Sequence, residues 1–211
     1  MQIPKIIHQI WIGYQDPPEW CTRFGEEMQA MHPGWEYKLW NHDDIFNGIY
    51  KDDPFLKEYI TNPEVYKWAF MADRIRLLIL RDFGGIYVDL DAKPIRPFDL
   101  VLNELSDQHT FFAGMKDSQS NNTLIDCAVY GAAPNSRIIN ECLSEYVNVT
   151  WAHGCKTFSE KIIKRFGMDV ALFNYEYFYN WEVNDTTIVL HDVIETRLFS
   201  WTDGNPNKKV W

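Results

Sequence analysis

Apolar and polar positions alternate with two different periods along the first part of the chain. Residues 5–12 form an apolar, β-branched run, which is typical of a buried strand. Apolar residues at helical spacing follow over 17–28, where a proline pair suits the first turn of a helix. Aromatic and polar residues then alternate over 35–40, as in a second strand. The chain is therefore predicted to open as strand, helix and strand.

The strongest periodic signal is a longer helix in the middle of the chain. Apolar residues recur at i, i+3, i+4 and i+7 from Trp68 to Ile79, and a glycine pair at 84–85 ends the pattern. The apolar run 86–91 follows as a strand, and 43–60 is interpreted as short helical pieces. A strand thus follows directly on the central helix.

The second half continues the alternation of strands and helices. We expect strands over 110–115, 124–132 and 187–191, helices over 136–149 and 157–166, and a loose polar end over 203–211. No repeat or linker divides the chain. The pattern predicts one α/β domain over residues 1–211, with a Rossmann-like central mixed sheet flanked by helices.

Charge and composition narrow the function classes. Asp and Glu total 30 against 20 Lys and Arg, so the net charge of -10 argues against a nucleic-acid partner. We expect no transmembrane segment, because no apolar run of about 18 residues occurs. The N-terminus lacks a secretory pattern, and the 4 cysteines have no CxxC spacing. Reduced thiols and a cytoplasmic location are therefore expected.

The first candidate site lies at Asp89 and Asp91, at the end of the apolar run 86–91. Residues i and i+2 of a strand face the same side, so both carboxylates can converge. Such a pair indicates a divalent cation with oxygen ligands, Mn²⁺ or Mg²⁺. A D-x-D motif alone is weak, because two solvated acidic residues give the same pattern.

Asp73 and Arg76 lie one turn apart on the preceding helix. They can form an ordinary i,i+3 ion pair. Alternatively, the carboxylate binds a ligand hydroxyl and the guanidinium faces a phosphate or a sugar. His8, in an apolar strand, is expected to be a hydrogen-bonded core histidine.

Two segments resemble a known family. Residues 3–13 and the block 72–91 are similar to the opening and the central signature of family 32 glycosyltransferases, which carry a DXD sugar-binding region. The block also resembles the glucosylating domain of the large clostridial toxins, and the length is close to that of compact bacterial or algal-virus transferase domains. The resemblance implies a GT-A fold, a nucleotide-sugar donor and Mn²⁺ or Mg²⁺. By this resemblance the chain can also be one domain of a longer protein.

The resemblance implies a role for each candidate metal residue. Asp91 would ligate the metal, and Asp89 would contact its coordination shell and the hydroxyls of the ribose or sugar. His191 would lie near the metal and the diphosphate. The alternative for His191 is a buried, hydrogen-bonded histidine.

The resemblance also implies a donor pocket. Asp73 and Arg76 would hold the donor sugar, and Tyr87 would line the pocket. The donor-binding set is completed by Trp11, expected against the nucleotide base with Ile10 beside it, and by Trp201, expected to close over the donor. The alternatives are that Trp11 belongs to the core and that Trp201 packs as a tail residue.

The predicted reaction moves a hexose from a nucleotide sugar to a glycan acceptor. UDP-glucose is the first expectation for the donor, with GDP-mannose and UDP-galactose open. Retention of configuration is implied by the resemblance, with Asp89, Asp91 and Arg76 in the catalytic set. Asp126 is the candidate on the acceptor side, where an inverting enzyme would need a base.

Two other functions remain open. A phosphatase of the haloacid-dehalogenase type also has an apolar strand that ends in D-x-D, but there the motif follows the first strand. A non-catalytic module that binds nucleotide sugars would keep the same motif without turnover.

Overall fold

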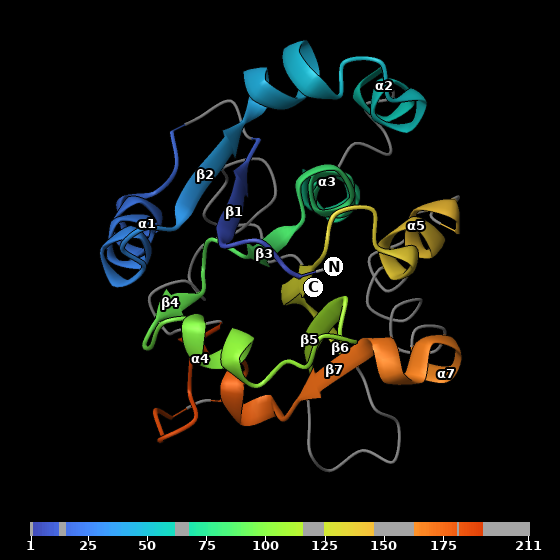
Figure 1. Cartoon of the computed structure of the whole chain (residues 1–211). Helices are drawn as coiled ribbons and strands as arrows, with labels where there is room; N and C mark the ends of the chain where they lie inside the picture. Colours follow the sequence, from blue (N-terminus) through green and yellow to red (C-terminus); the bar gives the residue numbers. More distant parts are fainter. Residues whose placement is uncertain are drawn as a thin grey trace.

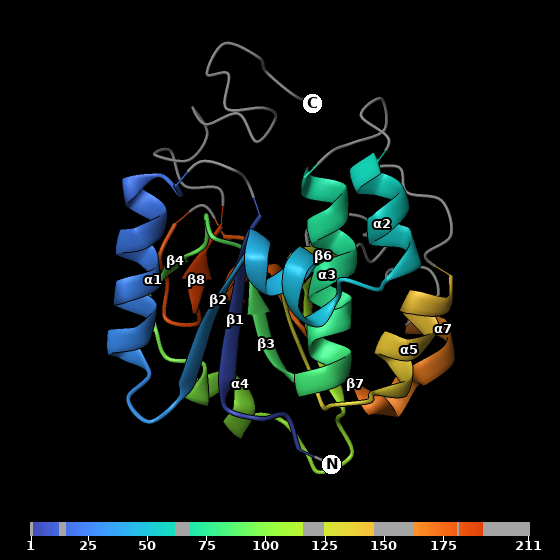
Figure 2. The ribbon, with the colours of Figure 1, turned by 90° about the horizontal axis from the view of Figure 1, so that it is seen from above.

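The structure is a computed structural model that describes residues 2–12, 16–61, 68–115, 125–145, 163–180 and 182–191. Its strands form a six-stranded sheet in the order β2-β1-β3-β6-β5-β7 (Figure 1) and a two-stranded ribbon, β4-β8 (Figure 2). The strands are β1 (Ile6–Trp11), β2 (Glu36–Asn41), β3 (Gly85–Val88), β4 (Lys93–Pro94), β5 (Phe111–Met115), β6 (Ile125–Ala132), β7 (Val170–Phe173) and β8 (Val189–Leu190).

The large sheet is mixed, as predicted. β1 pairs in parallel with β2 and β3, and β5 pairs in parallel with β7. β6 runs antiparallel to both β3 and β5. β3 therefore lies inside the sheet, between a parallel and an antiparallel neighbour.

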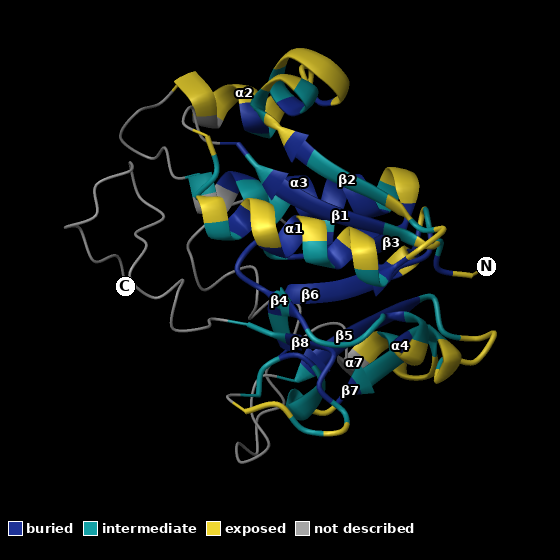
Figure 3. Cartoon of the chain, turned by 90° about the vertical axis from the view of Figure 1, so that its left-hand side faces the viewer, coloured by how far each residue is buried: buried dark blue, intermediate teal, exposed yellow. Residues whose placement is uncertain are grey.

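Helices cover both faces of this sheet. The α-helices are α1 (Glu19–Met31), α2 (Pro54–Thr61), α3 (Trp68–Phe83), α4 (Asp99–Asn103), α5 (Arg137–Ser144) and α7 (Ile163–Phe166), and the other helical turns are η1 (Asp43–Ile49), η3 (Gly167–Asp169) and η4 (Tyr175–Tyr177). Figure 2 shows α1 on one side of the strands and α3 on the other. Each face has its own buried cluster, with Met28 of α1 in one and Met71 and Ile75 of α3 in the other. Figure 3 shows the resulting pattern, in which the sheet is largely buried and the outer helix surfaces are exposed.

Two glycines allow the chain to pass from α3 into β3. Gly84 has φ 65° and Gly85 has φ 93°, a left-handed backbone that side chains disfavour. A Cβ at position 85 would also lie 2.6 Å from the carbonyl oxygen of Ile6. The glycine pair therefore both ends α3, as predicted, and lets β3 lie close against β1.

The strand predicted over 86–91 is shorter in the structure. β3 ends at Val88, and the Ala92 N–H donates to the Asp89 carbonyl at 3.1 Å, which closes a turn. The prediction that Asp89 and Asp91 share one face of a strand is therefore wrong, because a turn places them. The sequence analysis also missed β4, α4 and β7, which are too short for periodicity to show.

Most other predicted elements are confirmed, with ends shifted by a few residues. β1, α1, β2, α3, β5, β6, α5 and β8 fall within or close to their predicted ranges. The predicted helices over 136–149 and 157–166 extend partly outside the described residues, and the end over 203–211 lies wholly outside them. Within the described ranges, no helix has the length and apolar character needed to cross a bilayer.

His8 is the core histidine that the sequence predicted. The indole N–H of Trp40 donates to His8 Nδ1 at 3.2 Å, and His8 Nε2 lies 2.9 Å from the carbonyl oxygen of Gly84. Because an indole N–H can only donate, the network assigns the proton of His8 to Nε2, which donates to Gly84. His8 thus joins β1, β2 and the turn that precedes β3.

The cysteines in the described residues are free. Cys21, Cys127 and Cys142 are all buried as thiols. Burial, and then the negative charge of Asp91, raises the pKa of Cys21 far above its usual value. The reduced state expected from the spacing of the cysteines stays a prediction.

Candidate active site

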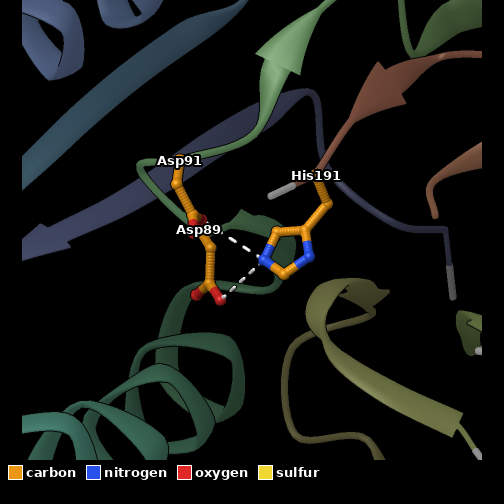
Figure 4. Close-up of side chains that lie close together, drawn as sticks. All are labelled: Asp89, Asp91 and His191. Carbon is orange, nitrogen blue, oxygen red and sulfur yellow. Dashed lines mark ion pairs between the residues drawn. The ribbon is translucent and has the colours of Figure 1, made fainter. Parts of the chain in front are cut away.

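Three side chains that can bind a metal meet at the carboxyl end of β3. Asp89 directly follows β3, and Asp91 lies in the turn between β3 and β4. His191 directly follows β8, which pairs antiparallel with β4 so that Lys93 lies opposite Leu190. Figure 4 shows the His191 imidazole pointing toward both carboxylates. The ribbon β4-β8 therefore brings a residue from the far end of the described chain to the D-x-D turn.

The distances between these three groups are short. His191 Nε2 lies 3.3 Å from Asp91 Oδ1 and 3.7 Å from Asp89 Oδ2. One ligand atom from each residue falls within 4.8 Å of the others. The Oδ1 of Asp91 is fully buried, and among the described residues no hydrogen-bond donor of good geometry reaches it; the contact with His191 is an ion pair. A buried carboxylate oxygen that accepts no hydrogen bond favours a bound cation.

The residues that contact Asp89 hold its carboxylate in one orientation. The Tyr87 hydroxyl donates to Asp89 Oδ1 at 2.6 Å, and Arg76 Nη1 lies 3.5 Å from the same oxygen. Gln9 Nε2 donates to the backbone carbonyl of Asp89 at 3.3 Å. Oδ1 is therefore held by the protein, whereas Oδ2 faces His191.

Arg76 contacts several polar groups next to the site. Its side chain extends from α3, is 9% exposed, and donates to the carboxylate of Asp73 and to the carbonyl of Cys127. The guanidinium also lies over the Tyr87 ring, 4.7 Å from its centroid. The ion pair between Asp73 and Arg76 is formed as the simpler interpretation predicted, and it also reaches Asp89.

Local charges shift the pKa values of the histidine and the first carboxylate. Burial disfavours a charged His191, but the carboxylates of Asp91 and Asp89 outweigh it and raise its pKa well above the usual value. Burial would raise the pKa of Asp89, yet Arg76 and then His191 hold it below its usual range. The site therefore favours an ionised Asp89 beside a positive charge.

Asp73 has the opposite shift. Burial, against the opposing charge of Arg76, raises the pKa of Asp73 to about 6, and the charges of Asp89 and Asp126 add to the rise. Four carboxylates thus share one region with Arg76 and with His191, whose imidazole must lose its proton to bind a metal. The surplus of negative charge favours a further cation in this region.

Asp126 lies on β6, the strand next to β3. Its Oδ1 accepts a hydrogen bond from the backbone N–H of Ala128 at 3.2 Å. Tyr179 lies nearby: its hydroxyl accepts from the Val129 N–H at 3.1 Å, and its ring meets the His191 ring edge-on at 5.8 Å. The structure therefore places Asp126 beside the carboxylate cluster.

The remaining residues predicted to bind the donor are Ile10, Trp11 and Trp201. Ile10 is 7% exposed and belongs to the core cluster beneath α3. Trp11 is half-buried at the end of β1, opposite Asn41. Trp201 lies outside the described residues.

Sequence reasoning missed two residues of the site. Gln9 is fully buried and also accepts a 2.6 Å hydrogen bond from the Tyr37 hydroxyl, so it connects β1 and β2 to Asp89. A glutamine inside an apolar strand needs buried partners, and that was an available signal. Tyr179 follows a segment with no clear periodicity, so nothing in the sequence pointed to it.

The arrangement fits a divalent cation. Two carboxylates and an imidazole are suitable ligands for Mn²⁺, and carboxylates alone suit Mg²⁺. The buried, unsatisfied Oδ1 of Asp91 and the mutual approach of the three groups are the observations that support this fit. Asp89 Oδ2, Asp91 and His191 would hold the ion.

Comparisons with known proteins agree with this geometry. Residues 18–112 match the family described as "Glycosyltransferase sugar-binding region containing DXD motif". Inositol phosphoceramide mannosyltransferase 3 of Schizosaccharomyces pombe is 38% identical over 104 residues, which are 48% of this chain and 28% of that relative. The chain thus matches only about a quarter of that relative's length.

Solved structures support the fold. A glycosyltransferase involved in glycosylation of the major capsid of PBCV-1 aligns with a TM-score of 0.59 at 12% identity, covering 89% of this chain and 93% of that one. The PaToxG glycosyltransferase aligns with a TM-score of 0.56 at 20% identity, covering 78% of this chain and 70% of that one. The predicted GT-A fold and the resemblance to an enzyme family are confirmed. Residues 18–112 are thus similar to a glycosyltransferase sugar-binding region with a DXD motif, and the described chain has a GT-A fold.

Proposed function

We propose that this chain transfers a hexose from a nucleotide sugar to a glycan acceptor and that it requires Mn²⁺ or Mg²⁺. The observation that carries the proposal is the convergence of Asp89, Asp91 and His191 at the carboxyl end of β3. Ligands bind at this end of the strands in open α/β sheets. The matched DXD region contains both aspartates.

Charge explains why this site needs a cation to accept a diphosphate. Asp73, Asp89, Asp91 and Asp126 gather here, and their negative charge would repel an anionic donor. A bound divalent ion supplies charge stabilisation to the departing diphosphate. The chain's own residues keep the ligands in place, since Tyr87 and Arg76 fix Asp89.

The donor is the finer part of the proposal. We keep UDP-glucose as the first candidate, with GDP-mannose and UDP-galactose as alternatives. The yeast relative is named as a mannosyltransferase, which favours a mannose nucleotide as the main competitor. In this proposal Asp73 and Arg76 bind the donor sugar, Tyr87 lines the pocket, and Trp11 and Trp201 contact the nucleotide side. Ile10 lies in the core next to Trp11 and would act only by packing behind it.

The proposed stereochemical outcome is retention. The acceptor hydroxyl attacks the sugar from the face that the diphosphate leaves, and a departing diphosphate oxygen takes the acceptor proton. Arg76 supplies positive charge close to the carboxylates. Asp126, on the neighbouring strand, contacts the acceptor rather than acting as an essential base.

A panel of nucleotide sugars tests this function. UDP-glucose, UDP-galactose and GDP-mannose are each incubated with the protein, with Mn²⁺ or with EDTA, and free nucleotide is measured. Release from one donor, lost with EDTA, supports the proposal. Metal-dependent binding without release, in the presence or absence of glycan acceptors, would favour a non-catalytic binding module. Phosphate release from a simple phosphoester instead would favour a phosphatase, although the motif follows β3 and not the first strand.

The cytoplasmic location also stays a proposal. It rests on the cysteine pattern, and the three described thiols fit a reducing compartment. Labelling of the intact protein with a thiol reagent after denaturation would count free cysteines and test it.

A further inference from the structure

Two of the three candidate metal ligands lie next to the ends of the short ribbon β4-β8. Asp91 stands two residues before Lys93 of β4, and His191 directly follows Leu190 of β8. Each strand has 2 residues, so their own pairing contributes little to fixing one against the other. Another interaction must hold β8 in register if His191 is to stay against Asp91.

Arg96 provides such an interaction. Its Nη1 donates to the backbone carbonyls of Asn184 at 2.5 Å and Thr187 at 3.1 Å. The backbone N–H groups of Ile95 and Arg96 both donate to the carbonyl of Ile188, at 2.8 and 3.0 Å. The segment just after β4 therefore binds the segment just before β8 at three carbonyls, those of Asn184, Thr187 and Ile188.

The bound segment forms a tight turn that directs its carbonyls to Arg96. Asn184 Oδ1 accepts hydrogen bonds from the backbone N–H groups of Thr186 and Thr187, at 2.9 and 3.0 Å, and from both of their hydroxyls. Thr187 is fully buried. Asp185 also lies 3.9 Å from Arg96 Nη2, but its side chain is fully exposed, so this ion pair contributes little. The carbonyl bonds are the main contribution of Arg96.

We propose that Arg96 is a positioning residue: by holding the turn 184–188, it keeps His191 against Asp91 and so sets the affinity of the metal site. This inference rests on the proposed function, because the metal site is part of it. Arg96 would not be a ligand of the ion, because within the described residues it binds carbonyls of the turn and Asp185. A guanidinium can bridge two carbonyls from one side, whereas a lysine ammonium is a single point of contact on a flexible stem.

Calorimetric titration with Mn²⁺ alone tests the proposal in the full chain. Arg96→Gln is expected to weaken Mn²⁺ binding about tenfold, as loss of an outer support of a metal ligand does, and Arg96→Lys less. Arg81→Gln is the matched control, because Arg81 is 34% exposed against 31% for Arg96 and pairs with the adjacent Asp82. The control should bind Mn²⁺ like the unchanged protein.

A double variant separates positioning from a general structural role. If Arg96 acts through His191, then adding Arg96→Gln to His191→Ala causes no further loss of Mn²⁺ affinity. An equal further loss in that background, or unchanged affinity in Arg96→Gln alone, would overturn the proposal.

Hydrogen exchange gives a readout that needs no metal. In Arg96→Gln, the amides of Ile95 and of residue 96, which both donate to the Ile188 carbonyl, should exchange faster while α3 and β6 keep their protection. Unchanged exchange at both amides would also overturn the inference. If the unchanged protein bound no Mn²⁺, the proposed metal site would fail, and the exchange result would still decide whether Arg96 holds the turn.

Discussion

The hydroxyl of Tyr87 donates a 2.6 Å hydrogen bond to Oδ1 of Asp89, two residues further along the chain. This bond uses one oxygen of the carboxylate and leaves Oδ2 on the side of His191, 3.7 Å from its Nε2. Tyr87 is 3% exposed, and its ring packs against Tyr130 and beneath the Arg76 guanidinium. The orientation of a proposed metal ligand is thus set by a buried residue of β3.

Removal of that hydroxyl should weaken the site without unfolding it. In Tyr87→Phe the ring keeps its packing, but Asp89 Oδ1 loses its shortest hydrogen bond. We expect Mn²⁺ affinity to fall about tenfold, measured by calorimetry, with a melting temperature within a few degrees of the unchanged protein. Tyr50→Phe is the matched control, because its buried hydroxyl donates to Asp82, a carboxylate that is not part of the site. An equal loss in both variants would contradict the role assigned to Tyr87.

Asp91→Asn should abolish metal binding in the calorimeter. Asparagine keeps the size of the side chain and removes the charge that a divalent cation needs. The fold should persist, because loss of one carboxylate from a cluster of four relieves repulsion and offsets the lost contact with His191. Circular dichroism checks the fold, and Asp52→Asn, at an exposed ion pair with Lys57, is the control that should bind normally.

Stability should fall in mild acid because of His8. Burial lowers the pKa of His8 from 6.5 to about 4, against the opposing hydrogen bond to Gly84. The unfolded chain therefore takes up this proton first as the pH falls, so stability is complete above about pH 6.5 and is lost progressively down to about pH 4. Between about pH 7.5 and pH 5, this group should cost about 2 kcal/mol, measured by urea unfolding.

His8→Gln isolates that contribution. Glutamine carries no titrating group, so the variant should lose about 2 kcal/mol less stability over the same pH interval, even if it starts from a lower value. His32, whose pKa burial also lowers, is present in both proteins and cancels in the comparison. Equal acid sensitivity in the two proteins would show that His8 is not the cause.

Periodicity in the sequence predicted the long elements well because their burial is one-sided and regular. The apolar positions of α3 and the alternation in β2 are examples. It failed at β3, where the chain leaves the sheet at Val88 and a turn, not strand alternation, brings Asp89 and Asp91 together. Turn geometry depends on partners such as the Ala128 carbonyl, which accepts from the Asp89 N–H at 2.8 Å, and these are distant in sequence.

In the site, too, local sequence patterns predicted some residues, and contacts between distant segments placed the others. Asp73 and Arg76 were visible as an i,i+3 pair on one helix, and Asp89 and Asp91 as a motif. His191 was proposed from family resemblance, and only the pairing of β8 with β4 explains its approach. Gln9 and Arg96 act through backbone carbonyls, which no side-chain motif in a sequence records.

Asp126→Asn tests the stereochemical proposal. We expect a modest, severalfold reduction in transfer to the acceptor and little change in donor hydrolysis, because Asp126 is not the base in a retaining reaction. Proton NMR of the product made by the unchanged protein gives the configuration directly. A β-linked product from an α-linked nucleotide sugar would contradict retention, and Asp126 would then be tested as the base.

The most direct test of the account is a calorimetric titration of the unchanged protein with UDP, with GDP as the comparison nucleotide. Each titration is done once with Mn²⁺ present and once with EDTA. The account predicts that one of the two nucleotides binds with Mn²⁺, that EDTA removes the binding, and that Asp91→Asn removes it equally. Binding of either nucleotide that is the same with Mn²⁺ and with EDTA would contradict the assignment of Asp89, Asp91 and His191 as a metal site.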